Sequence, residues 1–130
     1  MQILINTSSE RPVYQQIIDR VKRDVAQGLL QKGDKLPTVR YLATQLAINP
    51  NTIAKAYQLL ELEGIITTRP GAGTFIAGND NQLSAAVREK LLREQMERLA
   101  VEAVHMQVDQ ETLSRWFSET CAKFNFPEKS

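Results

Sequence analysis

The residues with the most distinctive chemistry form a short polar run, Asn49-Pro50-Asn51-Thr52, with Lys55 one turn later. Asn as N-cap followed by Pro at the first helical position is typical of a helix start. The run has small polar side chains and no negative charge, so it could meet base edges, and Lys55 could reach a phosphate or a guanine edge. The free N–H groups of a helix start also favour phosphate. The alternative is ordinary capping chemistry, which is more common than base contact.

A second group of candidates flanks this helix on both sides. Thr38 is the predicted N-cap of the preceding helix, and Arg40 lies in its first turn, where that helix would cross a nucleic-acid backbone. Further on, Arg69 precedes Gly71 and Gly73, a narrow turn that could approach a minor groove or phosphates closely. Residues 35–60 contain three basic residues and no acid. Each signal alone also fits ordinary surface or turn chemistry, and the prediction rests on their order and close spacing.

Catalysis and metal binding have almost no support in the sequence. The chain has one cysteine, Cys121, and one histidine, His105, with no CxxC pair and no phosphate-binding loop. We therefore expect no enzyme activity, no metal and no cofactor. We expect Cys121 to be a buried structural thiol, and His105 to be a surface group or a partner of a helix C-terminus.

The candidate residues need elements that position them, and the hydrophobic spacing predicts these elements. One amphipathic helix runs from Pro12 to Gly28, a short one starts at Thr38, and a third runs from Pro50 to about Glu63. Residues 65–69 and 74–77 are β-rich on either side of a glycine turn, which predicts a hairpin. Together these elements make a winged helix-turn-helix, so the predicted fold class is mainly α with a small β-hairpin. Residues 2–5 are expected to form a short strand or a packed arm.

The chain after the hairpin is predicted to be a separate helical region. We place the winged domain at residues 1–78, a polar linker at 79–81 and a two-helix dimerisation region at 82–130. Its first helix has apolar residues at 4-3-4-3 spacing, a seam typical of helix pairing between subunits: Leu92, Met96, Leu99, Ala103 and Met106. The alternative is that this seam packs on Trp116 and Phe117 of a last helix capped by Asp109, and both arrangements can hold together.

Charge distribution and length narrow the class of protein. Residues 1–78 hold nine Lys and Arg against six Asp and Glu, a net of +3, whereas residues 79–130 hold seven against nine, a net of −2. No apolar run approaches a signal-peptide core or the roughly 18 residues of a membrane span, so we expect a cytoplasmic protein. A winged helix can also be a protein-interaction module, but Asn51, Thr52, Lys55 and Gln58 argue against an apolar or acidic contact face.

The sequence resembles the GntR family of bacterial transcription regulators and, within it, the small YtrA-like subfamily. The resemblance covers roughly residues 3–78 and rests on the segments 12–17, 28–29, 33–40, 49–57, 60–64 and 69–75. It implies a homodimer that binds an inverted-repeat operator in double-stranded DNA, usually for repression. By family position, Arg40, Asn51, Thr52 and Lys55 would meet DNA. Thr38 and Asn49 would help at phosphates, and Gly71 would bring the wing to the minor groove.

Two positions depart from the family pattern. Ala54 and Pro50 stand where many members have Arg, so Lys55 or Arg40 would have to supply the missing base contact. Control of binding by a small-molecule effector is left open. Two helices of this length cannot enclose a sizeable pocket alone, so an effector would bind at a dimer interface.

Overall fold

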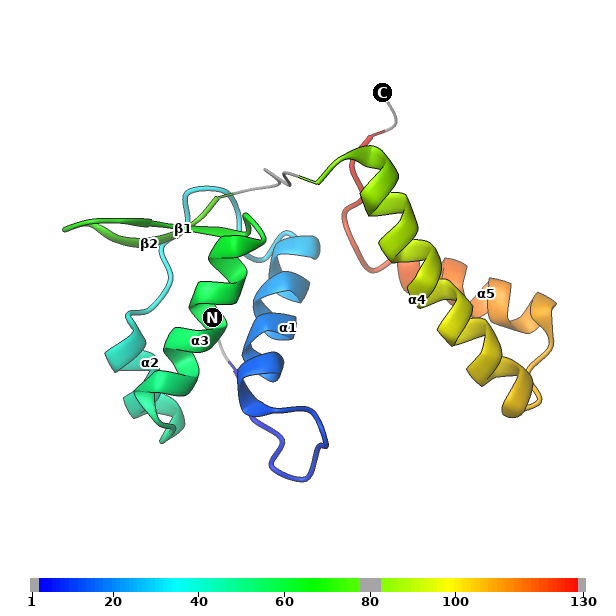
Figure 1. Cartoon of the computed structure of the whole chain (residues 1–130), viewed down its shortest axis with the longest axis horizontal. Coiled ribbons are helices and arrows are strands. Elements are labelled where there is room, and N and C mark those ends of the chain that lie inside the picture. The colour runs from blue at the N-terminus through cyan, green and yellow to red at the C-terminus, as the bar shows by residue number, and fades with distance from the viewer. Residues whose placement is uncertain (1–2, 78–82, 129–130) are drawn as a thin grey trace. The chain divides into compact units, whose positions relative to one another are not determined.

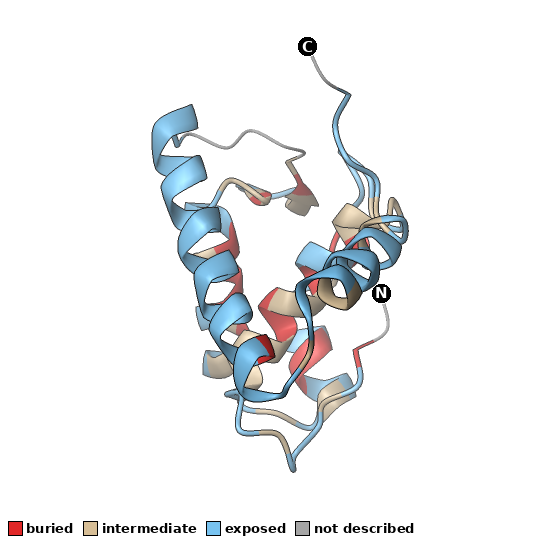
Figure 2. Cartoon of the chain, turned by 90° about the vertical axis from the view of Figure 1, so that its right-hand side faces the viewer, coloured by how far each residue is buried: buried red, intermediate tan, exposed pale blue. Residues whose placement is uncertain are grey.

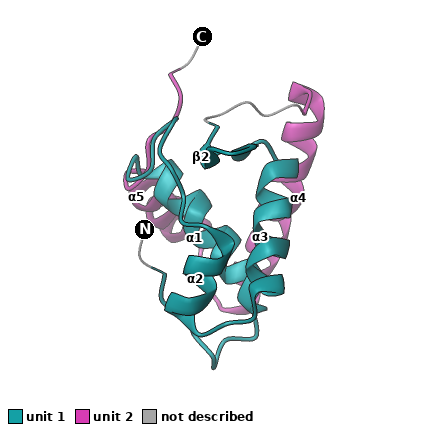
Figure 3. Ribbon diagram, turned by 90° about the vertical axis from the view of Figure 1, so that its left-hand side faces the viewer, with its two compact units in different colours: residues 1–81 teal, residues 82–130 magenta. Residues whose placement is uncertain are grey.

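The computed structural model describes residues 3–77 and 83–128, in two compact units that comprise residues 1–81 and 82–130 (Figure 3). The predicted linker, residues 79–81, lies outside the described residues. The described residues form five helices and a two-stranded antiparallel hairpin. This confirms the predicted fold class, mainly α with a winged helix-turn-helix followed by two helices.

Helix α1 (Val13–Ala26) begins directly after Pro12, whose extended backbone ends the preceding segment (Figure 1). Ile17 and Val21 are fully buried, as their spacing of one residue in four predicts. The helix is capped by Gln27, and the next residue, Gly28, has a φ of 79°. Glycine adopts this left-handed conformation without the steric cost of a Cβ, so the chain reverses there.

Helices α2 (Val39–Leu46) and α3 (Pro50–Leu62) start at the two predicted caps. Thr38 Oγ1 accepts a hydrogen bond from Tyr41 N at 3.0 Å, and Asn49 Oδ1 accepts one from Asn51 N at 2.8 Å. Ala47, between the helices, has a positive φ of 54°. The chain therefore changes direction within three residues, as a helix-turn-helix requires.

Strands β1 (Ile66–Arg69) and β2 (Gly73–Ile76) form the wing. They pair antiparallel from Ile66 opposite Ile76 to Arg69 opposite Gly73. Paired residues share a face, and Ile66 and Ile76 are both buried, so the base of the hairpin is anchored in the core. The turn between the strands, residues 70–72, is exposed.

Helix α3 is the centre of this unit, because it contacts α1, α2 and β1. Its buried side chains follow helical spacing: Ile53, Ala56, Tyr57 and Leu60. Ile3 joins the same core outside any strand, so the N-terminal segment is a packed arm, the second of the two alternatives. Figure 2 shows the buried positions gathered where the elements of this unit meet. With its inner side fixed by this packing, α3 presents its first turn to solvent.

The second unit consists of α4 (Ala85–His105) and α5 (Gln110–Cys121). Asp109 caps α5 as predicted, accepting from the hydroxyl of Thr112 at 2.6 Å and from its backbone N–H at 3.1 Å, and these bonds lower the pKa of the carboxyl. Among the described residues of this unit, Ala103 alone is buried, and α4 is otherwise exposed along its whole length (Figure 2). Two helices with one buried residue do not make a core of their own.

Candidate DNA-binding surface

The first turn of α3 is capped by Asn49 and exposed to solvent. Asn49 uses its side-chain oxygen to bind Asn51 N, and its backbone oxygen accepts from Thr52 N at 3.0 Å. Asn49, Asn51 and Pro50 are exposed, and Thr52 is half-buried. The amide groups of Asn49 and Asn51 can therefore donate to an acceptor outside the protein. No acidic side chain lies in this turn to repel a phosphate.

Lys55, one turn further along, is exposed but its side chain has a defined neighbour. Its Nζ lies 4.0 Å from the ring centroid of Tyr14, in the first turn of α1. A cation over a tyrosine ring at this distance is attracted by the negative face of the ring. The structure thus turns Lys55 toward the α1 side of α3. The sequence analysis did not single out Tyr14 for this role.

The second group of predicted residues lies at the start of α2. Thr38 is exposed and its hydroxyl oxygen is used as the cap, while Arg40 is exposed in the first turn. Tyr57, which is buried in α3, donates its hydroxyl to Pro37 O at 2.7 Å and so joins α3 to the segment before α2. Burial raises the pKa of Tyr57 to about 12, so this hydroxyl keeps its proton over the physiological range.

The third group of predicted residues lies on the wing. Arg69 lies at the end of β1, with its guanidinium 4.8 Å from the ring centroid of Phe75. Gly71 is exposed with a φ of 77°, and a Cβ built there meets no atom within 4 Å, so the turn is open to an approaching molecule. Glu61 of α3 accepts from Thr68 N at 3.1 Å and so connects α3 to the wing.

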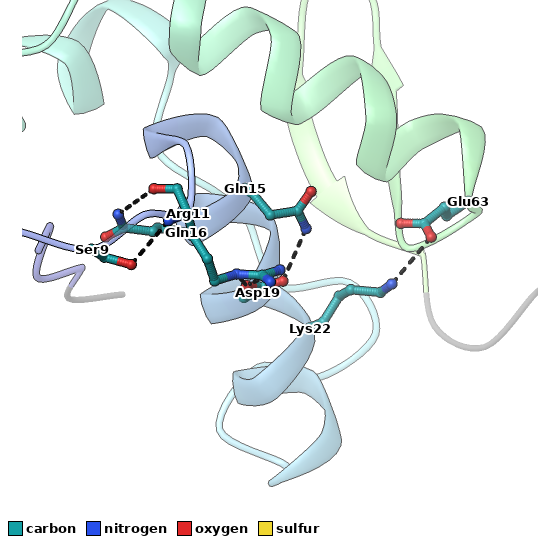
Figure 4. A network of polar contacts seen from close by, with 7 residues as sticks. All are labelled: Ser9, Arg11, Gln15, Gln16, Asp19, Lys22 and Glu63. Carbon is teal, nitrogen blue, oxygen red and sulfur yellow. Dashed lines mark hydrogen bonds and ion pairs between the residues drawn. The ribbon is translucent and has the colours of Figure 1, made fainter. Parts of the chain in front are cut away.

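Figure 4 shows a polar network that joins α1 to the segment before it and to the residue that follows α3. Lys22 donates to Glu63, just after α3, at 3.1 Å. Asp19 accepts from Arg11 at 2.8 Å and from Gln15 at 3.0 Å, which ties the segment before α1 to the helix. These exposed pairs contribute little stability each, and the Lys22–Glu63 pair connects α1 to the end of α3.

Two further residues beside this surface were missed by sequence reasoning. Lys35 and Tyr41, with Thr38, line an open hollow of about 480 Å³ formed by the segment before α2 and the start of that helix. Lys35 lies in the acid-free stretch that the sequence analysis noted, which is the signal that could have found it. Tyr41 is 58% exposed, and nothing in its sequence context marks it.

The residues of the predicted dimerisation seam have different surroundings in the structure. Met96 and Leu99 border a small hollow of about 160 Å³ with Leu113, Ser114 and Phe117 of α5, in agreement with packing inside one chain. Ala103 is buried, whereas Leu92 and Met106 are 57% and 70% exposed. The role of the seam between subunits stays a prediction.

The remaining titratable candidates lie apart from this surface. Cys121 has a free thiol and is half-buried, so it is less enclosed than the buried thiol we expected. His105 is exposed in the last turn of α4. Within residues 3–77 and 83–128, no group of three His, Cys, Asp or Glu side chains could hold a metal ion. In the same ranges, no helix is long and apolar enough to cross a membrane.

Comparison with known proteins agrees with the geometry. The family model for bacterial regulatory proteins of the gntR family matches residues 13–76, from the start of α1 to the end of the wing. The HTH-type transcriptional repressor YtrA of Bacillus subtilis is 41% identical over 120 residues, which are 92% of this chain and 92% of that protein. The similarity therefore includes α4 and α5 as well as the winged unit.

Solved structures give the same result. A transcriptional antiterminator from Listeria monocytogenes is 32% identical, with a TM-score of 0.85 over all of this chain and 98% of that one. The DNA-binding domain of AraR in complex with operator ORX1 is 28% identical, with a TM-score of 0.52 over 59% of this chain and 96% of that one. The chain thus belongs to the GntR family, a non-enzymatic DNA-binding family, and is a transcriptional regulator of the YtrA type.

Proposed function

We propose that this regulator is a repressor that binds an inverted-repeat operator as a homodimer. The observation that supports this most is the exposed, cap-fixed and acid-free first turn of α3, with the wing beside it. A helix presented in this way can enter a major groove with its N-terminus first. The relative YtrA, which matches almost the whole chain, is named as a repressor. Such a regulator acts where operator DNA lies, in the bacterial cytoplasm.

The second unit supplies the argument for a homodimer. Its helices leave large apolar side chains substantially exposed: Leu83, Val87, Leu91, Leu92, Met96, Leu99, Val101, Val104, Met106, Trp116 and Phe117. Short helices without tertiary packing are marginal in water, and an apolar patch of this extent marks an interaction surface. A two-fold dimer would cover these side chains and set two heads in opposite orientations, which requires an inverted repeat.

Within each head we assign the DNA contacts to the residues predicted from the sequence. Asn51 and Thr52 would meet base edges, and Arg40 and Lys55 would reach bases or phosphates. Thr38 and Asn49, at the two helix starts, would bind phosphates, and Arg69 with Gly71 would bring the wing to the minor groove. Ala54 offers no hydrogen bond to a base, so each head has few specific contacts and the dimer is needed for affinity.

A small-molecule effector would bind at the dimer interface of the second unit. The apolar hollow between α4 and α5 has a volume of about 160 Å³, which is below the roughly 300–1,000 Å³ of typical ligand pockets. A site that spans both copies would allow a ligand to change the separation of the heads.

The proposal is tested by selecting genomic fragments with the full-length protein and measuring binding to the recovered site by gel shift. We expect a palindromic site and a dimer in analytical ultracentrifugation. The Arg40→Ala/Lys55→Ala double variant should lose specific binding, whereas the matched control Lys32→Ala/Lys123→Ala, with the same charge change, should keep it. Undiminished binding by the first variant would refute the contact assignment, and a monomer bound to a single half-site would refute the dimer. A reporter gene behind the operator should be expressed more strongly when the regulator is removed.

A further inference from the structure

Residues 33–36, which precede α2, hydrogen-bond to strand β2 of the wing. Gly33 N donates to Ile76 O at 2.9 Å, Ile76 N donates to Asp34 O at 2.8 Å, and Leu36 N donates to Thr74 O at 2.8 Å. Lys35 is thereby paired with Phe75 across an antiparallel bridge. Because this backbone is hydrogen-bonded on both sides of Lys35, the residue has a fixed position beside β2.

The side chain of Lys35 then crosses the wing over Gly73. A Cβ built on Gly73 would lie 2.7 Å from Lys35 Cε and 3.4 Å from its Nζ. Gly73 also has a φ of 125°, a conformation that residues with a Cβ rarely adopt. The absence of a side chain at this position therefore leaves the space in which the ammonium group of Lys35 lies.

Arg69 projects from the same face of the wing. In the antiparallel register Arg69 is directly opposite Gly73, and directly opposed residues have side chains on one face. The pair Thr67 and Phe75 lies on this face as well, which explains why the guanidinium of Arg69 lies over the Phe75 ring. Two cations thus lie on one face of a two-stranded hairpin.

Neither cation is in an ion pair within the described part of the chain, where the ion pairs involve neither Lys35 nor Arg69. The acids nearest in sequence or in hydrogen-bonded structure bind backbone N–H groups instead: Asp34 accepts from Gln31 N at 2.8 Å, and Glu61 accepts from Thr68 N. Two cations on one face without an ion-pair partner favour an external anion.

We propose that Lys35 and Arg69 bind a backbone phosphate of the operator on this face of the wing. The wing would then contact the DNA strand through this face as well as through its glycine turn. Lys35 also lines the open hollow at the start of α2, together with Thr38 and Tyr41. A strand that lies along the N-terminus of α2 would therefore reach Lys35 as well. This assignment rests on the proposed function, and it adds Lys35 to the contacts.

The test uses the full-length protein and fluorescence anisotropy over a series of NaCl concentrations, with the recovered operator duplex and an unrelated duplex of equal length. A phosphate contact adds about 0.9 to the steepness of log K against log salt, so Lys35→Gln should flatten the slope by up to about 1.8 for two heads. The loss of affinity should be the same fold on both duplexes, because phosphates have no sequence. Lys32→Gln, the same charge change at an exposed residue further from the wing turn, should leave the slope unchanged.

The outcomes separate this inference from the function on which it rests. If Lys35→Gln leaves the salt slope unchanged and operator selectivity intact, the wing assignment alone is overturned. An equal decrease of the salt slope in Lys32→Gln would overturn it as well. If Lys35→Gln weakens binding to the operator but leaves binding to the unrelated duplex unchanged, Lys35 contacts bases. That result would also overturn the phosphate assignment. If the unaltered protein does not distinguish the two duplexes, the proposed function fails, while the slope on either duplex still tests the phosphate contact. Lys35→Arg, which keeps the charge, should retain most of the slope.

Discussion

The stacking of Lys55 on Tyr14 gives a prediction about how the recognition helix is prepared for DNA. Tyr14 is half-buried on α1 and Lys55 is exposed on α3, with 4.0 Å between the ammonium group and the ring centroid. If the ring holds Lys55 in the orientation that meets DNA, replacing Tyr14 by Leu should weaken operator binding. The protein would then have to order a free lysine side chain when it binds.

The size of the effect follows from the geometry. A cation–π contact at an exposed site contributes about 0.5–1 kcal/mol. Two heads in a dimer give about 1–2 kcal/mol, which is roughly a 5- to 25-fold rise in Kd. Tyr14→Phe keeps the ring and should lie within about twofold of the unaltered protein, so it is the matched control.

The assay is fluorescence anisotropy with the operator duplex at one fixed salt concentration, on four proteins that form a double-mutant cycle. Tyr14→Leu should raise Kd in the normal background and have no effect when Lys55 is already Ala, because the two residues act through one contact. Tighter binding by Tyr14→Leu would show that the ring competes with DNA for Lys55, and would refute the reasoning. An equal loss in both backgrounds would show that Tyr14 acts through the packing of α1 instead.

Three other changes have expected outcomes. In the wing, Gly73→Ala should lower the free energy of unfolding by more than Gly71→Ala does in urea denaturation. Both have a positive φ, which costs about 1–3 kcal/mol for other residues, but the φ of 125° at Gly73 lies further from the left-handed helical region near +57° than the 77° at Gly71, and the end of the Lys35 side chain would also have to move at Gly73. Tyr57→Phe should cost about 1 kcal/mol by removing the bond to Pro37 O. Tyr57→Phe should also remove the loss of stability that the unaltered protein shows at high pH. The unfolded tyrosine loses its proton near pH 10 and the folded one near 12, so the free energy of unfolding falls as pH rises through that interval. Leu92→Glu should shift analytical ultracentrifugation from dimer to monomer and weaken operator binding, because Leu92 is 57% exposed on the predicted seam, and a full dimer would contradict the placement of the interface.

The parts of the fold that depend on local chemistry could be predicted from the sequence. Thr38, Asn49 and Asp109 were identified as caps because a cap is satisfied within three residues of itself, and all three accept the expected hydrogen bonds. The wing followed from β-rich segments around glycines for the same reason. The strands could be located to within about one residue, since the turn determines their pairing.

Contacts between distant segments could not be obtained in this way. The pairing of Lys35 with Phe75 joins residues forty positions apart, and nothing in the periodicity of either segment encodes it. The neighbour of Lys55 depends on the angle at which α1 crosses α3, which is set by the whole core.

The helical region shows a different limit. The 4-3-4-3 spacing gave one seam on α4, but Val87, Leu91, Val101 and Val104 lie outside it and are also exposed and apolar. A helix that is apolar on more than one side has more than one partner. The spacing could therefore not decide which side meets α5 and which side would meet a second copy.

These features together determine how such a regulator would select its operator. The reading turn of α3 has amides and a hydroxyl for bases, but Ala54 has no polar group to offer, so direct readout is limited to a few hydrogen bonds. In the proposed complex the cations would meet phosphates: Lys55 beside α1, and Lys35 and Arg69 on the wing. Affinity should then depend strongly on salt, while selectivity should depend on whether two half-sites are spaced to meet both heads at once. Insertion of five base pairs between the half-sites, about half a helical turn, should therefore cost more binding than the loss of any one base contact.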